Sequence, residues 1–222
     1  MADIKKSFAK KYGGSIEQIN TLLDQIKQVE TNNKDIEQKG GGPGRGFYQF
    51  EKTSKNKKGE YIQAGAMTAR NRLKNLYIKL GKNVPEWLTQ TGMRDPSIGF
   101  NALGLSEEKQ DDLLLADFYY KKVRGFDEEG KKKLFKDAFE SGDSSKAWVH
   151  AHWAGPEKNI DEKLAQFKRN VKIDKSIAGD NLVEQSKKKD SDQTDQKRAE
   201  NGVFKKESEA NATLSELSKS ST

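Results

Sequence analysis

Glu30 is the residue whose type and position best suit proton-transfer chemistry. Four apolar residues precede it at alternating three- and four-residue steps and would share one helical face: Ile16, Ile19, Leu23 and Ile26. Glu30 occupies the next position of that face. A carboxylate there costs free energy unless it is paired or protonated, so the position favours a raised pKa and a general acid. The alternative interpretation is a glutamate that only marks where the face reaches solvent.

Three short motifs follow one another along the chain, and their order and spacing are informative. The first is Glu30-Thr31, and the second, Gly46-Phe47-Tyr48-Gln49, ends nineteen positions after Glu30. The third is Ala151-His152-Trp153-Ala154-Gly155-Pro156. Each motif alone carries little information, so their order and spacing are what matter.

Together the three motifs resemble the signature of the soluble lytic transglycosylases and goose-type lysozymes, which reads Glu-Ser, Gly-Leu-Met-Gln and Ala-Tyr-Asn-Ala-Gly. The resemblance spans about residues 15–156. It implies a mainly α, lysozyme-like α+β fold with a small β-hairpin beside the cleft. Residues 42–51 also resemble lysozyme-type domains of bacteriophage structural proteins.

The resemblance implies cleavage of the β-1,4 bond between N-acetylmuramic acid and N-acetylglucosamine, so peptidoglycan glycan strands would be the substrate. Glu30 would first protonate the glycosidic oxygen and then take a proton from the C6 hydroxyl of the muramic acid, giving a 1,6-anhydro product. No cofactor is required. Glu51, two residues after Gln49, is the candidate second carboxylate if the enzyme instead hydrolyses the bond with water.

Substrate contacts are expected from the residues of the same motifs. Gln49 has an amide donor and acceptor for a sugar, and Trp153, beside a glycine stop, is a candidate for lining a saccharide cleft. Phe47, Tyr48 and Phe50 are expected mostly in the core, with one of them able to stack on a sugar. The remaining candidates are Thr31, which keeps the hydroxyl of the family's Ser, and His152 and Gly155. His152 and Trp153 stand where the family has Tyr and Asn.

Helices are predicted through most of the chain. Ser15 with Gln18 is a capping-box pattern, and the helix that it opens should run to about Glu30. Further helices are expected over about 4–12, 64–80, 84–88, 106–123, 127–139, 145–153 and 159–173. Residues 32–46 contain five glycines and should form a loop, and residues 47–59 favour a small hairpin or a helical turn.

Composition excludes several classes of site. The 222 residues include no cysteine, so neither a disulfide nor a thiolate metal site is available. The two histidines, His150 and His152, would lie about 200° apart on a helix, which argues against zinc. No apolar run is long enough to span a membrane, and the first residues show no secretory signal. A wall-degrading activity would then require holin-type release or delivery in a phage virion.

The C-terminal segment differs in composition from the rest of the chain. Residues 171–222 contain ten basic and ten acidic residues, which leaves 31 basic and 24 acidic residues for 1–170. We expect residues 1–170 to form the peptidoglycan-cleaving domain, and 171–222 to be a disordered or extended tail that orders only in an assembly. The alternative function is a phage virion structural or ejection protein with little activity, whose tail binds other virion proteins. Scattered lysines disfavour nucleic-acid binding.

Overall fold

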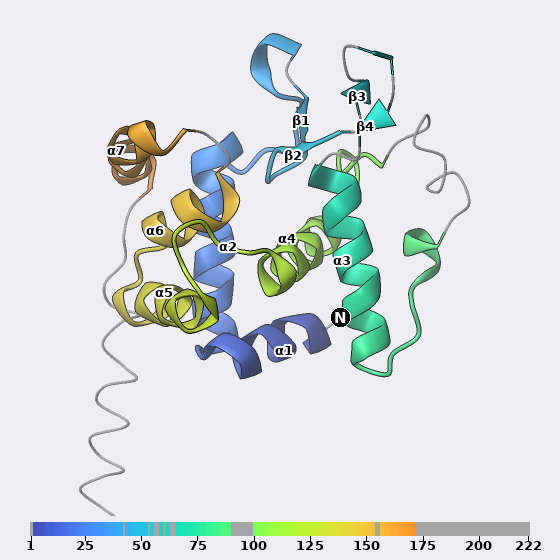
Figure 1. Cartoon of the computed structure of the whole chain (residues 1–222), viewed down its shortest axis with the longest axis horizontal. Coiled ribbons are helices and arrows are strands. Elements are labelled where there is room, and N and C mark those ends of the chain that lie inside the picture. The colour runs from blue at the N-terminus through green and yellow to red at the C-terminus, as the bar shows by residue number, and fades with distance from the viewer. Residues whose placement is uncertain are drawn as a thin grey trace, which may run out of the picture. The chain divides into compact units, whose positions relative to one another are not determined.

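The computed structural model describes residues 2–41, 43–52, 54–55, 58–59, 61–62, 65–89, 100–153 and 156–171. The chain divides into one unit over Met1–Ile177 and a second over Ala178–Thr222, and every described residue belongs to the first. Most described residues are helical, which confirms the mainly α class (Figure 1). Of the predicted tail, only Val171 lies among the described residues.

The helices follow the predicted order. Within the described residues the α-helices are α1 (Ala2–Tyr12), α2 (Ile16–Thr31), α3 (Gly65–Lys79), α4 (Glu107–Tyr120), α5 (Glu128–Ser141), α6 (Ser145–Ala147) and α7 (Ile160–Asn170). Short 3-10 turns lie at Lys39–Gly41, Glu86–Leu88 and Glu157–Asn159, and a π-helical turn, Trp148–His152, follows α6.

The helix that carries Glu30 begins and ends where local chemistry requires. The Ser15 hydroxyl accepts from the Gln18 backbone, and the Gln18 side chain accepts from the Ser15 backbone, which confirms the capping box. At the other end Asn32 takes a left-handed conformation, with φ of 55°, and its N–H donates to Gln28 O. Glu30 therefore lies in the last turn of α2.

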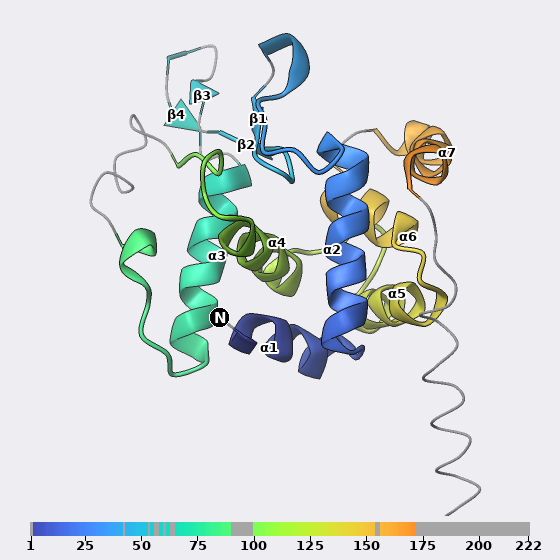
Figure 2. The same cartoon turned by 180° about the vertical axis from the view of Figure 1, so that it is seen from behind.

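Helix α4 forms the centre of the core. Its run Leu113-Leu114-Leu115-Ala116 is fully buried, as expected for a helix that is covered on several sides. Figures 1 and 2 show α4 between α2 and α3, with α1 crossing near one end of the group. Helix α2 lies on one side of α4 and helix α3 on the other, and residues of both line the site described below.

Several predicted helices have different boundaries in the structure: the one expected over 159–173 ends at Asn170, and the one expected over 84–88 is the 3-10 turn Glu86–Leu88. The helix expected over 106–123 ends at Tyr120, because the chain turns extended at Lys121, and Val123 is buried outside any helix. The helix expected over 145–153 is a single α turn followed by the π-helical turn. Val171 is 7% exposed and its N–H donates to Phe167 O, so the folded part continues past the expected boundary at residue 170.

Two pairs of short antiparallel strands form the β part. β1 (Gly44–Arg45) pairs with β2 (Phe50–Glu51), and β3 (Ser54–Lys55) pairs with β4 (Tyr61–Ile62). The β1–β2 pair closes around residues 46–49, which contain the second motif. A small hairpin is thus present, but its first strand lies within the expected loop 32–46 and not within 47–59, and the second motif lies between its strands.

Candidate active site

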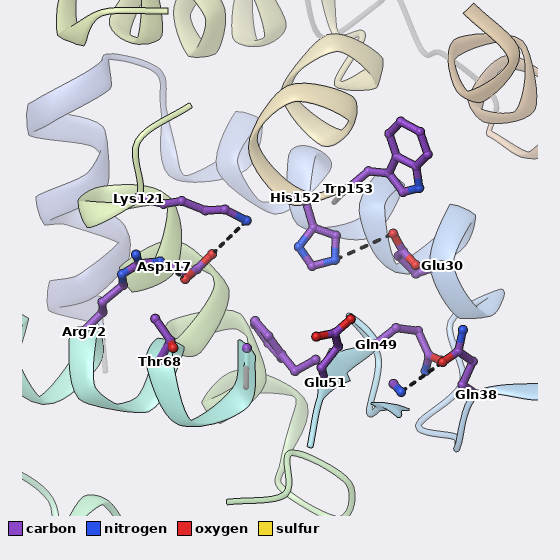
Figure 3. Close-up of a pocket in the computed structure, with 13 residues that line it drawn as sticks. Glu30, Gln38, Gln49, Glu51, Thr68, Arg72, Asp117, Lys121, His152 and Trp153 are labelled. Carbon is purple, nitrogen blue, oxygen red and sulfur yellow. Dashed lines mark hydrogen bonds and ion pairs between the residues drawn. The ribbon is translucent and has the colours of Figure 1, made fainter. Parts of the chain in front are cut away.

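Glu30 projects from the end of α2 into a cavity of about 600 Å³ (Figure 3). Its side chain is 17% exposed. The cavity is lined by residues of α2, the β1–β2 hairpin, α3, the end of α4 and the π-helical turn: Glu30, Gln38, Gly44, Gln49, Phe50, Glu51, Gly65, Thr68, Arg72, Asp117, Lys121, His152 and Trp153. Segments more than 100 residues apart in sequence therefore share one cavity.

A second cavity of about 640 Å³ is also lined by Glu30. Its lining includes Glu30, Gln38 and Gln49, which also line the first cavity, together with residues at the end of α2 and in the following loop. Glu30 thus borders both cavities.

The pKa of Glu30 is set by burial against two opposing influences. Burial raises the pKa to about 7, while a hydrogen bond from Trp148 and the positive charge of Lys163 both act to lower it. The Trp148 indole donates from Nε1 to Glu30 Oε1 at 2.5 Å. The carboxyl group is therefore partly protonated near neutral pH, and its anion has a donor already in place.

His152 lies close to Glu30 but does not pair with it. Burial and the charge of Lys121 lower the pKa of His152 to about 3, so the imidazole is neutral at ordinary pH. Its Nε2 lies 2.8 Å from Tyr48 O, and because a carbonyl oxygen only accepts, Nε2 carries the hydrogen. The 3.6 Å between Nε2 and Glu30 Oε1 is too long for a hydrogen bond. His152 thus links the π-helical turn to the hairpin.

Gln49 lines both cavities, but its amide is only partly available to a ligand. Its Nε2 donates to Ile36 O at 3.1 Å and to Gly46 O at 2.8 Å, which uses both amide hydrogens. Only the acceptor oxygen remains for a sugar. The Gln49 backbone has a φ of 50°, a left-handed conformation that the tight turn imposes.

Tyr48 lies in the core, as mainly expected, and lines neither cavity, so it is not the aromatic residue that could stack on a sugar. Its side chain is 0% exposed, and its hydroxyl donates to Asp111 Oδ1 at 2.5 Å. Phe47 packs against the core and lines neither cavity, while its N–H donates to Gln110. Both residues hold the turn in place, whereas Phe50 is one of the aromatic side chains that line the first cavity.

The remaining predicted residues divide between cavity and scaffold. Trp153 lines the first cavity, with Lys163 Nζ 5.7 Å from the centre of its ring. Glu51 lines the same cavity from β2 and is exposed. Thr31 lines the second cavity, but its hydroxyl lies 3.1 Å from Lys27 O and 3.2 Å from Phe47 O, where it joins α2 to the turn. Gly155 lies outside the described residues.

Sequence reasoning missed several residues of this site, and four of them have charged or hydrogen-bonding roles: Trp148, Arg72, Asp117 and Lys121. Trp148 was interpreted as core packing; it is 2% exposed, but its N–H also holds Glu30, which lies 118 residues away. Its position four residues before His152 was the available signal, because both would then face one side of a helix. Arg72, Asp117 and Lys121 gave no signal, since neither motif nor spacing connects α3 with the end of α4.

The described residues offer no site for a metal and no membrane span. No group of three or more His, Asp or Glu side chains in the described part of the chain could hold a metal ion. Within the same residues, no helix is both long and apolar enough to cross a membrane.

In comparisons with protein-family models, with curated proteins and with solved structures, nothing matched this chain. The geometry of the site therefore carries the functional argument, together with the three motifs.

Proposed function

We propose that this chain cleaves the β-1,4 bond between N-acetylmuramic acid and N-acetylglucosamine in peptidoglycan, with Glu30 as acid and base. The observation that carries the proposal is a largely buried carboxyl group whose pKa is raised to about 7, on a residue that lines two cavities. A general acid works best when its pKa lies near the operating pH. The fold class and the three motifs add to this support.

The proposed reaction needs one carboxyl group. Protonated Glu30 gives its proton to the glycosidic oxygen while the bond from that oxygen to C1 of the muramic acid breaks. The Glu30 carboxylate then takes the proton of the C6 hydroxyl of the same sugar as its oxygen bonds to C1. The products are a new chain end and a 1,6-anhydro sugar, and Glu30 is protonated again.

The surroundings of Glu30 suit both halves of this cycle. Burial keeps the proton on the acid before the reaction, and the Trp148 N–H stabilises the anion formed midway. The positive charge of Lys163 acts in the same direction. The carboxylate therefore forms without being left unpaired in a buried site.

Hydrolysis is the competing route, and Glu51 is its candidate base. Glu51 is exposed on β2 and lines the cavity into which Glu30 projects. A glycosidase that uses water needs a second carboxylate across the bond from the acid. We place this route second because the motifs resemble those of the single-glutamate family.

The second candidate function is a phage virion or ejection protein that retains this scaffold with little activity. The observation that favours it is the position of His152, whose Nε2 donates to the Tyr48 carbonyl within the fold. The third motif then serves to hold the hairpin, not the substrate. Both candidate functions involve delivery in a phage virion, and this part of the proposal rests on the resemblance of residues 42–51 to lysozyme-type domains of phage structural proteins.

Analysis of the fragments released from purified peptidoglycan by mass spectrometry tests the proposal. The intact protein should release anhydro-ended fragments, and Glu30→Gln should lower the rate at least about a hundredfold, because one acid–base group contributes that much. Glu51→Gln, in the same cavity, is the matched control and should retain the rate. Reducing-end fragments whose release depends on Glu51 would indicate hydrolysis. No release by a protein shown to be folded would leave the scaffold function.

A further inference from the structure

The end of the first cavity farthest from Glu30 carries a compact group of charges. Arg72 projects from α3, and Asp117 and Lys121 come from the end of α4 (Figure 3). In the same view His152 lies between this group and Glu30. None of these three charged residues belongs to the motifs on which the proposed function rests.

Two cations share one carboxylate in this group. Arg72 Nη1 donates to Asp117 Oδ1, and Lys121 Nζ lies 3.8 Å from Asp117 Oδ2. The Asp117 side chain is 8% exposed, whereas those of Arg72 and Lys121 are 27% and 34% exposed. The group therefore carries a net positive charge, and its accessible atoms are the cationic ones.

The Arg72 guanidinium has more donors than its contacts within the described part of the chain use. It has five N–H groups, and among the described residues Asp117 is its one hydrogen-bond partner. A planar guanidinium of this kind can bind a second carboxylate through two parallel hydrogen bonds. A purely structural bridge between α3 and α4 would need only one cation for Asp117.

The positive charge acts within the cavity. Lys121 is one of the causes that lower the pKa of His152, after burial. Glu51 is the other charged residue of the cavity wall between the charge group and Glu30, and it is exposed, so water screens it. An anionic group of a ligand would thus meet the cations with little opposition from Glu51.

We propose that Arg72 and Lys121 bind a carboxylate of the peptide attached to the glycan strand, and so select peptide-bearing peptidoglycan over uncharged glycans. This inference rests on the proposed function, because it names the part of the substrate that fills the far end of the cavity. Stem peptides carry free carboxylates, while the sugars beside the scissile bond offer mainly hydroxyl and acetamido groups. In this arrangement the scissile glycosidic bond lies at the Glu30 end of the cavity, and the peptide carboxylate binds at the end that carries Arg72 and Lys121.

Binding to a matched pair of ligands tests the inference. One ligand is a soluble peptidoglycan fragment with its stem peptides, and the other is the same fragment with its peptide carboxylates converted to amides. Both are titrated by calorimetry against the Glu30→Gln protein, which does not consume them. The carboxylate form should bind about fivefold more tightly than the amide form, and added salt should reduce this preference.

Arg72→Gln and Lys121→Gln, each in the Glu30→Gln background, should each weaken binding of the carboxylate form about fivefold and leave the amide form unchanged. Lys122→Gln is the matched control, since Lys122 is the exposed neighbour of Lys121 and lines neither cavity. Thermal unfolding of every variant shows whether the α3–α4 bridge is lost. Equal effects on both ligands, or no effect on either, would overturn the inference.

The two proposals fail in different ways. If the intact protein releases no fragments from peptidoglycan, the proposed function fails whatever the ligands show. If it releases fragments through Glu30 while both variants keep the unaltered preference between ligands, the charge group is structural and only this inference fails.

Discussion

At the scale of single residues, Glu30 shows how one side chain can be costly for folding and useful for chemistry. Its burial raises the pKa from an ordinary value of 4.5 to about 7. Ionisation of Glu30 at higher pH therefore destabilises the folded state, and the Trp148 hydrogen bond to the carboxylate offsets part of this loss of stability. This balance predicts how both stability and activity depend on pH.

The first prediction concerns stability. The folded protein holds the Glu30 proton up to about pH 7, whereas the unfolded chain releases it near 4.5, so the folded state binds more protons between these values. The contribution to stability is complete below pH 4.5 and is lost as pH rises to 7. Between pH 4.5 and 8 the intact protein should therefore lose on the order of 3 kcal/mol relative to Glu30→Gln.

Urea unfolding of both proteins across this range measures the difference, and the comparison cancels other groups that titrate there, such as Asp112, whose pKa burial raises to about 7. Parallel curves for the two proteins would show that Glu30 has an ordinary pKa, and the acid role would lose its basis.

The second prediction concerns Trp148. Trp148→Phe keeps an aromatic ring in the core and removes the N–H that stabilises the Glu30 anion. The pKa of Glu30 should then rise by about one unit, because a hydrogen bond to a charged group is worth about 1.5 kcal/mol or more. The alkaline limb of the pH–rate profile for fragment release should move up by the same amount. Phe167→Leu, which alters the ring packed on Trp148, is the control; if both variants shift the limb equally, packing is responsible, not the N–H.

At the scale of elements, the β1–β2 turn is held by groups that lie outside it. Gln110 of α4 accepts the Phe47 N–H and donates to Asp35 and Leu105, and Tyr48 is tied to Asp111 of the same helix. Gly46, with φ of 80°, lets the turn approach Gln110. The central helix thus positions the hairpin from which Gln49 and Glu51 line the cavity.

The third prediction separates backbone strain from this close approach. A Cβ at Gly46 would collide with the Oε1 atom of Gln110, whereas a Cβ at Gly13, whose φ of 82° is nearly the same, would meet nothing within 4 Å. Gly13→Ala should cost about 1 kcal/mol of unfolding free energy, and Gly46→Ala about 2 kcal/mol more. Denaturant unfolding measures both. Equal losses would mean that Gln110 moves aside without cost and does not hold the turn.

At the scale of the whole molecule, the site forms where three distant parts of the chain meet. The buried hydrophobic residues of the described part run from Ile4 to Val171 and form one core around α4. Helix α2, the hairpin and the π-helical turn all pack against that core, so Glu30, Gln49 and His152 line one cavity.

Much of the local structure follows from nearby residues. The Ser15–Gln18 capping box, the stop of α1 before Gly13 and the Asp127 cap of α5 each depend on contacts within four residues, and each matches the prediction. Helix α4 departs from its predicted ends. Ser106 precedes it but makes no capping hydrogen bond with its side chain, and the helix ends at Tyr120, before the expected end at Val123. Propensity sets where a helix can form, while packing decides where it ends.

The sequence by itself determined the mainly helical class and the apolar face of Ile19, Leu23 and Ile26 that Glu30 continues, because periodicity expresses these features. Ile16, expected on the same face, is 39% exposed, and the hairpin begins before the expected region. Only the tertiary structure decided that Trp148 donates to Glu30, that Tyr48 is buried against Asp111, and that two cations share Asp117. The physical reason is that these pairings join residues 45 to 118 positions apart, except for Lys121 with Asp117. Such contacts depend on how helices pack around a common core, which no local pattern of residues encodes.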